Sequence, residues 1–212
     1  MPEKNKEIKN KDEIIMKTEE IFEEISEEVL SMAQSLLEEH IEDDEDGRIL
    51  YNLGNICSEL WDSKTAFEYY TKAAEKGNGR ALFKLGVMYE NGNGIKEDIQ
   101  KALEYYNRAA DEFLCADAMY HLGYIHYYGI GVEQDRKKGF EFFMRAAEKE
   151  HYGALKAIAD SYYYGNEVIE KNTELAAKYA LDAYNQLNSD ADNLSLFNYS
   201  DYECDEYNDD EE

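Results

Sequence analysis

Apolar residues between positions 80 and 90 recur at intervals of three and four, with polar residues between them. This spacing predicts an α-helix with one buried face, formed by Ala81, Leu82, Leu85 and Tyr89. The stretch NGNGI at 91–95 follows, and its glycines allow the positive φ of a tight reversal. A second apolar stripe comes after a predicted N-cap at Asp98 and comprises Ala102, Tyr105, Tyr106, Ala109 and Ala110. The segment therefore predicts two helices joined by a glycine turn.

The same pattern recurs along the chain. Residues 66–77 read AFEYYTKAAEKG, residues 102–113 read ALEYYNRAADEF, and residues 139–150 read GFEFFMRAAEKE. Leu53, Leu85, Leu122 and Ile158 take one place in successive copies and lie 32, 37 and 36 residues apart. A period of this length is typical of stacked helix pairs, because neither helix of a pair can bury its apolar face alone. We predict units at about 47–78, 79–115, 116–152 and 153–184.

The flanks differ from the repeats. Between residues 13 and 41, Ile15, Phe22, Val29 and Leu36 lie seven apart, with Ile25 and Met32 between them. We interpret 13–46 as an amphipathic helix that caps the first unit, followed by an acidic linker; the alternative is a helix that dimerises through a coiled coil. Residues 1–12 and 185–212 are predicted to be a disordered charged N-terminus and a disordered acidic tail. Aromatic residues in the tail indicate a short docking motif or tyrosine phosphorylation sites; the alternative is a tail that only solubilises the protein and binds no partner.

Charge is concentrated at the two ends of the chain. The net charge is −26, with 5 basic and 17 acidic residues in 1–47 and 0 basic and 10 acidic residues in 185–212. Such ends argue against a nucleic-acid surface, which needs clustered Lys and Arg. The first residues lack the apolar core of a secretory signal, and no stretch approaches the length of a membrane span. We expect a cytoplasmic protein.

No sequence pattern indicates a catalytic, metal or cofactor site. The acidic stretch EDDEDG at 42–47 would place Leu53 where a calcium-binding loop needs its closing glutamate, so we exclude a calcium site of that type. The four histidines lack the spacing of metal ligands, and NGNG is not followed by the lysine of a phosphate loop. We expect no catalytic residues, no cofactor and no metal.

The repeat resembles the Sel-1-like repeat, a branch of the tetratricopeptide-like α/α-solenoids. The resemblance covers roughly two thirds of the chain, and the first and fourth units depart from it, since the first is shorter in its turn and the fourth has Ala159 in place of a glycine. The structural repeat positions that carry it are Leu53, Gly54, Ala81, Leu85, Gly86, Tyr89, Gly92, Gly94, Ala102, Tyr105, Ala109, Ala110, Leu122, Gly123, Gly129, Gly131, Ala146 and Ala147.

The resemblance implies an all-α, right-handed superhelical solenoid in which the first helix of each unit lines a concave, partner-binding face. By position, that face would contain Asn52, Asn55, Lys84, Met88, His121, Tyr124, Ile125 and Ser161. The family supplies adaptors in protein quality control and signalling, and it also occurs widely in bacteria and in giant viruses of amoebae. The implied function is therefore a non-catalytic scaffold or adaptor for a protein or peptide partner. If the protein is viral, its place would be the host cytoplasm. We expect a monomer, with dimerisation through 13–41 as the alternative. The alternative function is an acidic chaperone or decoy that binds basic clients through its charged ends.

Overall fold

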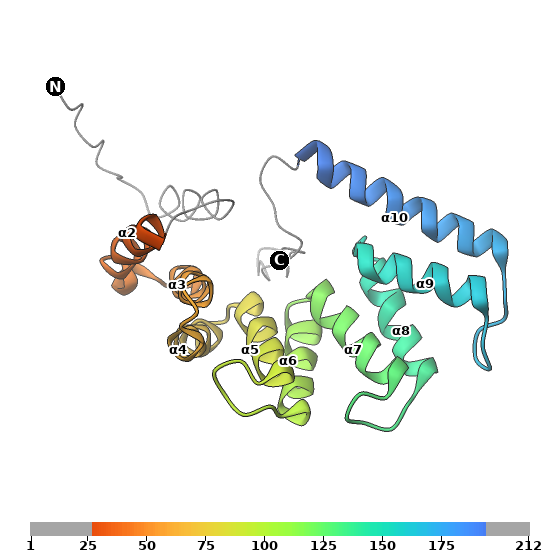
Figure 1. The fold of residues 1–212 in the computed structure, drawn as a ribbon, viewed down its shortest axis with the longest axis horizontal. Helices are drawn as coiled ribbons and strands as arrows, with labels where there is room; N and C mark the ends of the chain where they lie inside the picture. The colour runs from red at the N-terminus through yellow and green to blue at the C-terminus, as the bar shows by residue number, and fades with distance from the viewer. Residues whose placement is uncertain (1–26, 194–212) are drawn as a thin grey trace, which may run out of the picture. The chain divides into compact units, whose positions relative to one another are not determined.

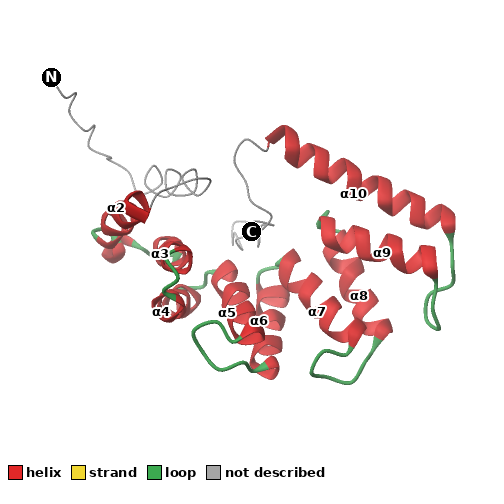
Figure 2. Cartoon of the chain, in the orientation of Figure 1, coloured by secondary structure: helices red, strands yellow, loops and turns green. Residues whose placement is uncertain are grey.

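The computed structural model describes residues 27–193, and over that range the chain is built from helices joined by short loops (Figures 1 and 2). The predicted all-α fold class is thereby confirmed. In chain order the elements are α2 (Glu27–Glu38), η1 (Ile41–Asp43), α3 (Arg48–Glu59), α4 (Ser63–Glu75), α5 (Gly79–Asn91), α6 (Ile99–Glu112), α7 (Ala116–Tyr128), α8 (Arg136–Ala147), α9 (Tyr152–Tyr164) and α10 (Thr173–Asn193). Along this range, no helix is long and apolar enough to cross a lipid bilayer.

The described residues divide into two compact units, with the boundary between Ala81 and Leu82 in the first turn of α5. The first unit contains α2, α3 and α4. The second contains most of α5 together with α6, α7, α8, α9 and α10, so it holds three helix pairs.

Each of the first three helix pairs is held by an aromatic ring that lies on a glycine. A Cβ atom built on Gly54 would come within 2.5 Å of the Tyr70 ring, and one on Gly86 within 2.4 Å of the Tyr106 ring. The third pair repeats the contact, with Phe143 at 2.5 Å from a Cβ on Gly123. A side chain at these glycines would exclude the ring, so the two positions depend on each other.

The alanines of the repeat complete the same interface. All of them except Ala147 are fully buried, and so are the repeat leucines of the first helices. The fully buried residues are Leu53, Ala81, Leu85, Ala102, Ala109, Ala110, Leu122 and Ala146. Ala147 is only half-buried, as are Tyr89 and Tyr105, whose rings stack with centroids 5.5 Å apart. Small residues let the helices approach closely, and the rings fill the space that remains.

The turns inside the helix pairs are formed as the glycines predict. Gly92, Gly94, Gly129 and Gly131 all have positive φ. At equivalent places, the N–H of Asp98 donates to the carbonyl of Tyr89 and the N–H of Asp135 to that of His126, both at 2.8 Å. The Asp98 carboxylate accepts from the backbone N–H of Gln100 and Lys101, so the predicted N-cap of α6 is confirmed.

The first unit replaces the glycine turn by a shorter one, in which Trp61 has a φ of 62° and is 90% exposed. In the fourth repeat, Gly165 ends α9 and the side chain of Asn172 caps α10. The helix α10 extends to Asn193, so the expected start of a disordered tail at 185 is corrected. No glycine or proline interrupts the chain between 173 and 193, which lets the helix continue.

The helix α2 packs against α3. Leu30, Ala33 and Leu37 form a buried cluster with Ile49, Leu53 and Ile56 of α3. This contact is what a capping helix requires, but its face differs from the predicted one. Val29 and Met32 are exposed and Leu36 is half-buried, because the helix turns the stripe at 30, 33 and 37 toward its neighbour. The part of the predicted helix before Glu27, with Ile15, Phe22 and Ile25, lies outside the described residues.

The acidic stretch after α2 has a structural role. The Asp44 side chain is buried, and its two carboxylate oxygens accept the backbone N–H groups of Ile49 and Leu50, each at 3.1 Å. These are N–H groups of the first turn of α3, which have no partner within the helix. The Lys76 ammonium donates to the carbonyl oxygen of Asp44. Gly47, with a φ of 77°, lies so close to Ala73 of α4 that a Cβ would be 2.6 Å from its carbonyl oxygen.

Replacing Asp44 by Ala should lower the free energy of unfolding by about 1–3 kcal/mol, because two buried N–H groups lose their acceptor. Guanidinium unfolding of the full chain followed by circular dichroism measures the change. Asp43→Ala is the matched control, since Asp43 is exposed in the same stretch, and should shift stability by less than about 0.5 kcal/mol. Equal effects of the two variants would contradict the capping role.

Candidate functional site

The first helix of each repeat carries three positions, spaced by four, of which one precedes and two follow the repeat leucine (Ile158 in the fourth repeat) at fixed offsets. On α7 they are Tyr120, Tyr124 and Tyr128, and on α9 they are Lys156, Asp160 and Tyr164. Residues four apart lie on one face of a helix, so each set forms a stripe. The corresponding residues of the first two repeats are Tyr51, Asn55 and Glu59, then Phe83, Val87 and Asn91.

The stripes on α7 and α9 meet at a pocket of about 330 Å³, which we call the tyrosine pocket. Its wall from α7 and α8 is aromatic, and its wall from α9 and the following loop is polar. The principal lining residues are Tyr120, Tyr124, Tyr127, Tyr128, Phe143, Lys156, Asp160, Ser161, Tyr164 and Asn166. The volume lies within the range of small-ligand and side-chain sites.

The rings of the tyrosine pocket form a continuous set. The centroids of Tyr124 and Tyr128 are 4.6 Å apart, and those of Tyr127 and Tyr128 are 5.1 Å apart. Tyr120 lies 6.4 Å from Tyr124 and 5.8 Å from Phe143, the ring that rests on Gly123. The glycine contact of the fold therefore also places the inner wall of the pocket.

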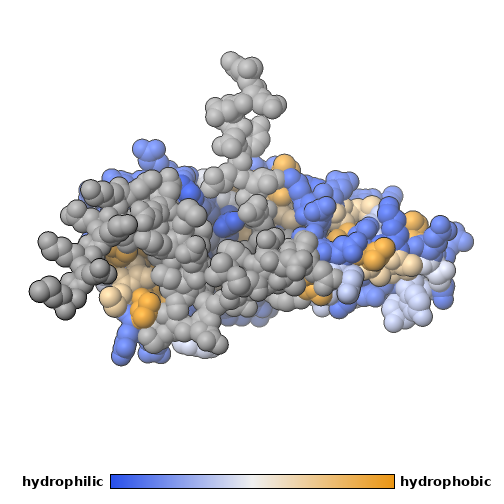
Figure 3. All heavy atoms as spheres, turned by 90° about the horizontal axis from the view of Figure 1, so that it is seen from above, coloured by the Kyte–Doolittle hydropathy of each residue, from blue (hydrophilic) through white to orange (hydrophobic). Residues whose placement is uncertain are grey.

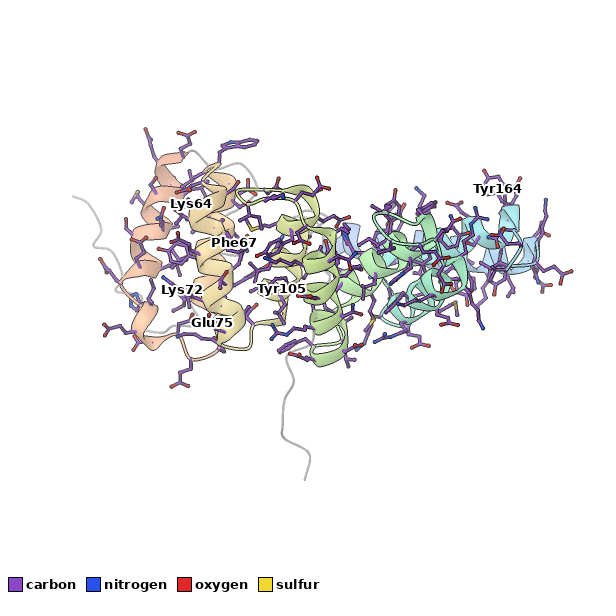
Figure 4. The ribbon with its side chains drawn as sticks, turned by 90° about the horizontal axis from the view of Figure 1, so that it is seen from below. Lys64, Phe67, Lys72, Glu75, Tyr105 and Tyr164 are labelled. Atoms are coloured by element: carbon purple, nitrogen blue, oxygen red, sulfur yellow. The ribbon has the colours of Figure 1, made fainter. Side chains whose placement is uncertain are left out.

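Three of the outer rings are open to solvent. Tyr124 is 42% exposed, Tyr128 55% and Tyr164 75%. Figure 4 shows Tyr164 on α9 together with the side chains that surround it. On the face seen in Figure 3, hydrophobic groups appear as separate spots among hydrophilic atoms. The tyrosine pocket thus brings three exposed aromatic rings together.

Hydrogen bonds fix the polar wall. Asn166 donates to the Tyr127 hydroxyl at 2.8 Å, and that hydroxyl is 3.3 Å from the Ser161 hydroxyl oxygen. Ser161 in turn donates to the Ala157 carbonyl one turn earlier in α9. Gly165 ends α9 with positive φ and donates to the Ser161 carbonyl, which turns the chain so that Asn166 faces the pocket.

The rings of two histidines contact the ring of Tyr120. The His151 ring stacks on Tyr120 with centroids 4.7 Å apart, and the His121 ring meets it edge-on at 5.9 Å. His151 is buried; its Nδ1 accepts the N–H of Ala154 at the start of α9, so the ring proton lies on Nε2, 3.2 Å from Asp117. His151 thereby ties the start of α9 to α7 and holds Tyr120 in place.

Tyr120 and Tyr128 of the pocket are neutral near pH 7. Burial raises the pKa of Tyr120, and the neighbouring Tyr124 and Tyr128 add to the effect. Burial also raises the pKa of Tyr128, with Tyr127, Tyr124 and Asp160 acting in the same direction and Arg136 against it. The formal charges on the pocket wall are therefore those of Lys156 and Asp160.

A separate polar cluster lies where α5, α6 and α7 meet. The Glu90 carboxylate accepts from the Tyr106 hydroxyl at 2.5 Å and lies 3.1 Å from Nδ1 of His121. Burial raises the pKa of Glu90, but the hydrogen bonds from His121 and Tyr106 outweigh it, so the pKa lies below its usual value. Burial and the Glu90 charge raise the pKa of Tyr106, which stays protonated. The cluster binds two neighbouring repeats together.

Among residues 27–187, whose side chains are described, no group of three or more His, Cys, Asp or Glu residues is arranged to hold a metal ion.

A model of the Sel1 repeat matches residues 47–78, 79–112, 116–151 and 154–186. The chain belongs to the Sel1 repeat family. These ranges agree closely with the predicted units, and the family resemblance is confirmed. Sel1 repeats generally mediate protein–protein interactions, and proteins built from them are generally non-catalytic scaffolds.

Solved structures show the same fold. The chain is similar to a Sel1 repeat protein from Oxalobacter formigenes, with 27% identity and a TM-score of 0.66 over 76% of this chain and 68% of that chain. It also resembles c5321, a protective antigen present in uropathogenic Escherichia coli strains, with 23% identity and a TM-score of 0.64 over 73% of this chain and 34% of that chain. The second likeness concerns the fold alone.

The structure places the predicted partner-binding residues of this Sel1 repeat protein in different surroundings. Tyr124 and Ser161 line the tyrosine pocket. The His121 ring interacts with the Glu90 carboxylate through Nδ1, and Asn55 accepts a hydrogen bond from the Tyr70 hydroxyl at 2.7 Å. Lys84 is half-buried on α5. Asn52, Met88 and Ile125 are buried, so we leave them out of the surface proposed below.

Sequence reasoning missed most of the pocket. The predicted residues did not include Tyr128, Lys156, Asp160 or Tyr164. On α7, Tyr128 lies four residues after the predicted Tyr124. On α9, Lys156 and Tyr164 lie four residues before and after Asp160, which takes the place of Tyr124 in the next repeat. Extending the i, i+4 spacing from Tyr124 to both ends of its helix, and then by one repeat period, would have found them. Asn166 has no such signal, because it lies in the irregular loop after α9.

The Glu90 cluster should make the stability of the second unit sensitive to acid. Because the folded pKa of Glu90 is depressed, its charged form adds stability above the unfolded value of about 4.5, and this is lost as the pH falls through the folded pKa. Glu90→Gln should therefore lower the free energy of unfolding at pH 7 by about 1 kcal/mol and by progressively less below pH 4.5. Urea unfolding at a series of pH values measures the difference.

The matched control is Glu104→Gln on the exposed face of α6, which should have little effect at any pH. A Glu90→Gln effect that is the same at pH 7 and at pH 3.5 would show that the charge of Glu90 does not stabilise the cluster.

Proposed function

We propose that this Sel1 repeat protein is an interaction scaffold that binds a segment of a partner protein at the tyrosine pocket between α7 and α9. The proposal rests above all on one observation: equivalent positions of two successive repeats present exposed tyrosines to one pocket. The corresponding residues of the first two repeats are Glu59 and Asn91, so exposed tyrosines are not a general property of this position.

The composition of the pocket fits recognition of a protein segment. Tyrosine offers a large apolar ring and a hydroxyl at low conformational cost, and it is enriched among the residues that dominate binding energy. The hydrogen-bonded wall of Ser161 and Asn166 and the packed ring of Phe143 keep the site formed before binding. Preorganisation of this kind reduces the entropy lost when a partner docks.

The proposal narrows the predicted binding face. Tyr124 and Ser161 remain in it, joined by Tyr128, Asp160 and Tyr164. Asn55, Lys84 and His121 belong to the same series of first helices but do not line the pocket, and the proposed binding site does not include them.

The test is selection of ligands from a random peptide display library on the full chain, followed by affinity measurement with fluorescein-labelled selected peptides. A Tyr124→Ala/Tyr128→Ala double variant should weaken binding by about tenfold or more, because it removes two exposed rings from the pocket. Tyr184→Ala is the matched control, since Tyr184 is 61% exposed on α10 outside the pocket, and it should leave affinity within about twofold.

Two outcomes would contradict the proposal. Either no peptide is selected, or the selected peptides bind the double variant as well as the parent chain. A different result would favour the alternative, in which the charged ends bind basic clients. In that case the double variant would leave the affinity unchanged, and the affinity would fall steeply as salt rises from 50 to 500 mM, because exposed charges are screened over about 10 Å at 0.1 M salt.

A further inference from the structure

We infer that the tyrosine pocket receives an arginine side chain of the partner segment, with the guanidinium against the tyrosine rings and paired with Asp160. This inference rests on the proposed function, because it names the chemistry that the same pocket selects. It starts from the electrostatic character of aromatic rings, whose faces attract cations.

Apart from Tyr127, the tyrosine rings of the pocket offer faces that no described cation occupies. In the described part of the chain, Arg136 lies 5.9 Å from the centroid of Tyr127, and Lys171 lies 5.4 Å from that of Tyr163. No described cation lies over Tyr120, Tyr124, Tyr128 or Tyr164 in this way. The pocket therefore gathers several unoccupied faces around one volume of about 330 Å³, which is enough for a single long side chain.

Asp160 supplies the complementary charge. It is exposed at the centre of the α9 stripe, one turn before Tyr164, and its negative charge adds to the effect of burial and of the neighbouring tyrosines in raising the pKa of Tyr128. No hydrogen bond or ion pair joins Asp160 to another residue within the range whose side chains are described. An unpaired carboxylate beside open aromatic faces is suited to a planar cation.

Lys156 also lines the pocket, and its positive charge would repel a cation bound there. Its ammonium lies over none of the pocket rings, and its side chain is exposed, so its flexible stem lets the charge turn toward water. Asp160 has no such freedom, because its short side chain keeps the carboxylate near the rings. The two residues thus provide variants with opposite predicted signs.

Arginine fits better than lysine for a geometric reason. The guanidinium is planar and delocalised, stacks on tyrosine faces and pairs with a carboxylate through two N–H groups. The ammonium of lysine is a compact and more strongly hydrated charge, so it loses more on leaving water. The net charge of −26 of the whole chain further favours the approach of basic segments.

The test uses peptides selected from the display library, each resynthesised with arginine, lysine or citrulline at its most sensitive basic position. Citrulline keeps the shape of arginine without its charge, so it should bind about tenfold more weakly, and lysine about threefold more weakly. Asp160→Asn should weaken the arginine peptide about fivefold and leave the citrulline peptide unchanged, whereas Lys156→Gln should strengthen the arginine peptide about twofold.

Several results would overturn the inference. The citrulline or lysine peptide could bind as tightly as the arginine peptide, the selected peptides could lack a sensitive basic residue, or the two α9 variants could act with the opposite signs, which would indicate an acidic ligand.

These failures differ from failure of the proposed function. Peptides that depend on Tyr124 and Tyr128 but not on charge would leave the binding site in place and remove arginine as its ligand. Arginine-dependent binding that Asp160→Asn does not change would also overturn the inference. Circular dichroism melting of each variant confirms that the exposed substitutions leave the fold intact.

Discussion

The contact between an aromatic ring and a helical glycine is the constraint on which the rest of this structure depends. Tyr70, Tyr106 and Phe143 each lie against the backbone of the preceding helix at Gly54, Gly86 and Gly123. The ring needs the space where a Cβ would be, and the glycine, unfavourable in a helix by about 1 kcal/mol relative to alanine, is retained because the ring fills that space. This exchange explains why the chain repeats small and aromatic residues in one order. In the fourth repeat both members change together, since Ala159 stands in the glycine place and Ala180 in the ring place.

The same contact prepares the surface on which binding is proposed. Phe143 rests on Gly123 with one part of its ring and contacts Tyr120 and Tyr127 with another. The first helix of the pair consequently turns one stripe toward its partner and a second stripe, with Tyr124 and Tyr128, away from it. His151 links this helix to the next repeat through Asp117 and Tyr120. The pocket is thus a product of repeat stacking, and its exposed residues Tyr124, Tyr128 and Asp160 lie outside the contact between ring and glycine.

Much of the fold followed from sequence because local signals and the repeat period agree. The helix pairs, the glycine turns and the Asp98 cap all depend on short-range rules that hold wherever the pattern occurs. The buried face of α2 did not follow, because heptad spacing alone cannot distinguish the stripe with Val29 and Met32 from the stripe with Leu30 and Leu37. Which one is buried depends on the position of α3. The role of Asp44 likewise depends on a loop that returns to the start of the next helix.

The site was less predictable than the fold. Tyr124 and Ser161, which were predicted by analogy with related solenoids, line the tyrosine pocket. Asn52, Met88 and Ile125 lie one helical position from the stripes and are buried. On a helix, a shift of one residue turns a side chain by about 100°, so a face assigned by analogy alone is easily displaced.

A double-mutant cycle between Gly123 and Phe143 tests the central claim most directly. We predict that Gly123→Ala lowers the free energy of unfolding by about 1–3 kcal/mol in the parent chain, because the new methyl group displaces the ring. In a Phe143→Val background, which lacks the ring atoms that the methyl group would meet, the same change should have an effect smaller by at least about 1 kcal/mol. Additive effects within about 0.5 kcal/mol would contradict the account, since they would mean that the glycine and the ring stabilise the helix pair independently.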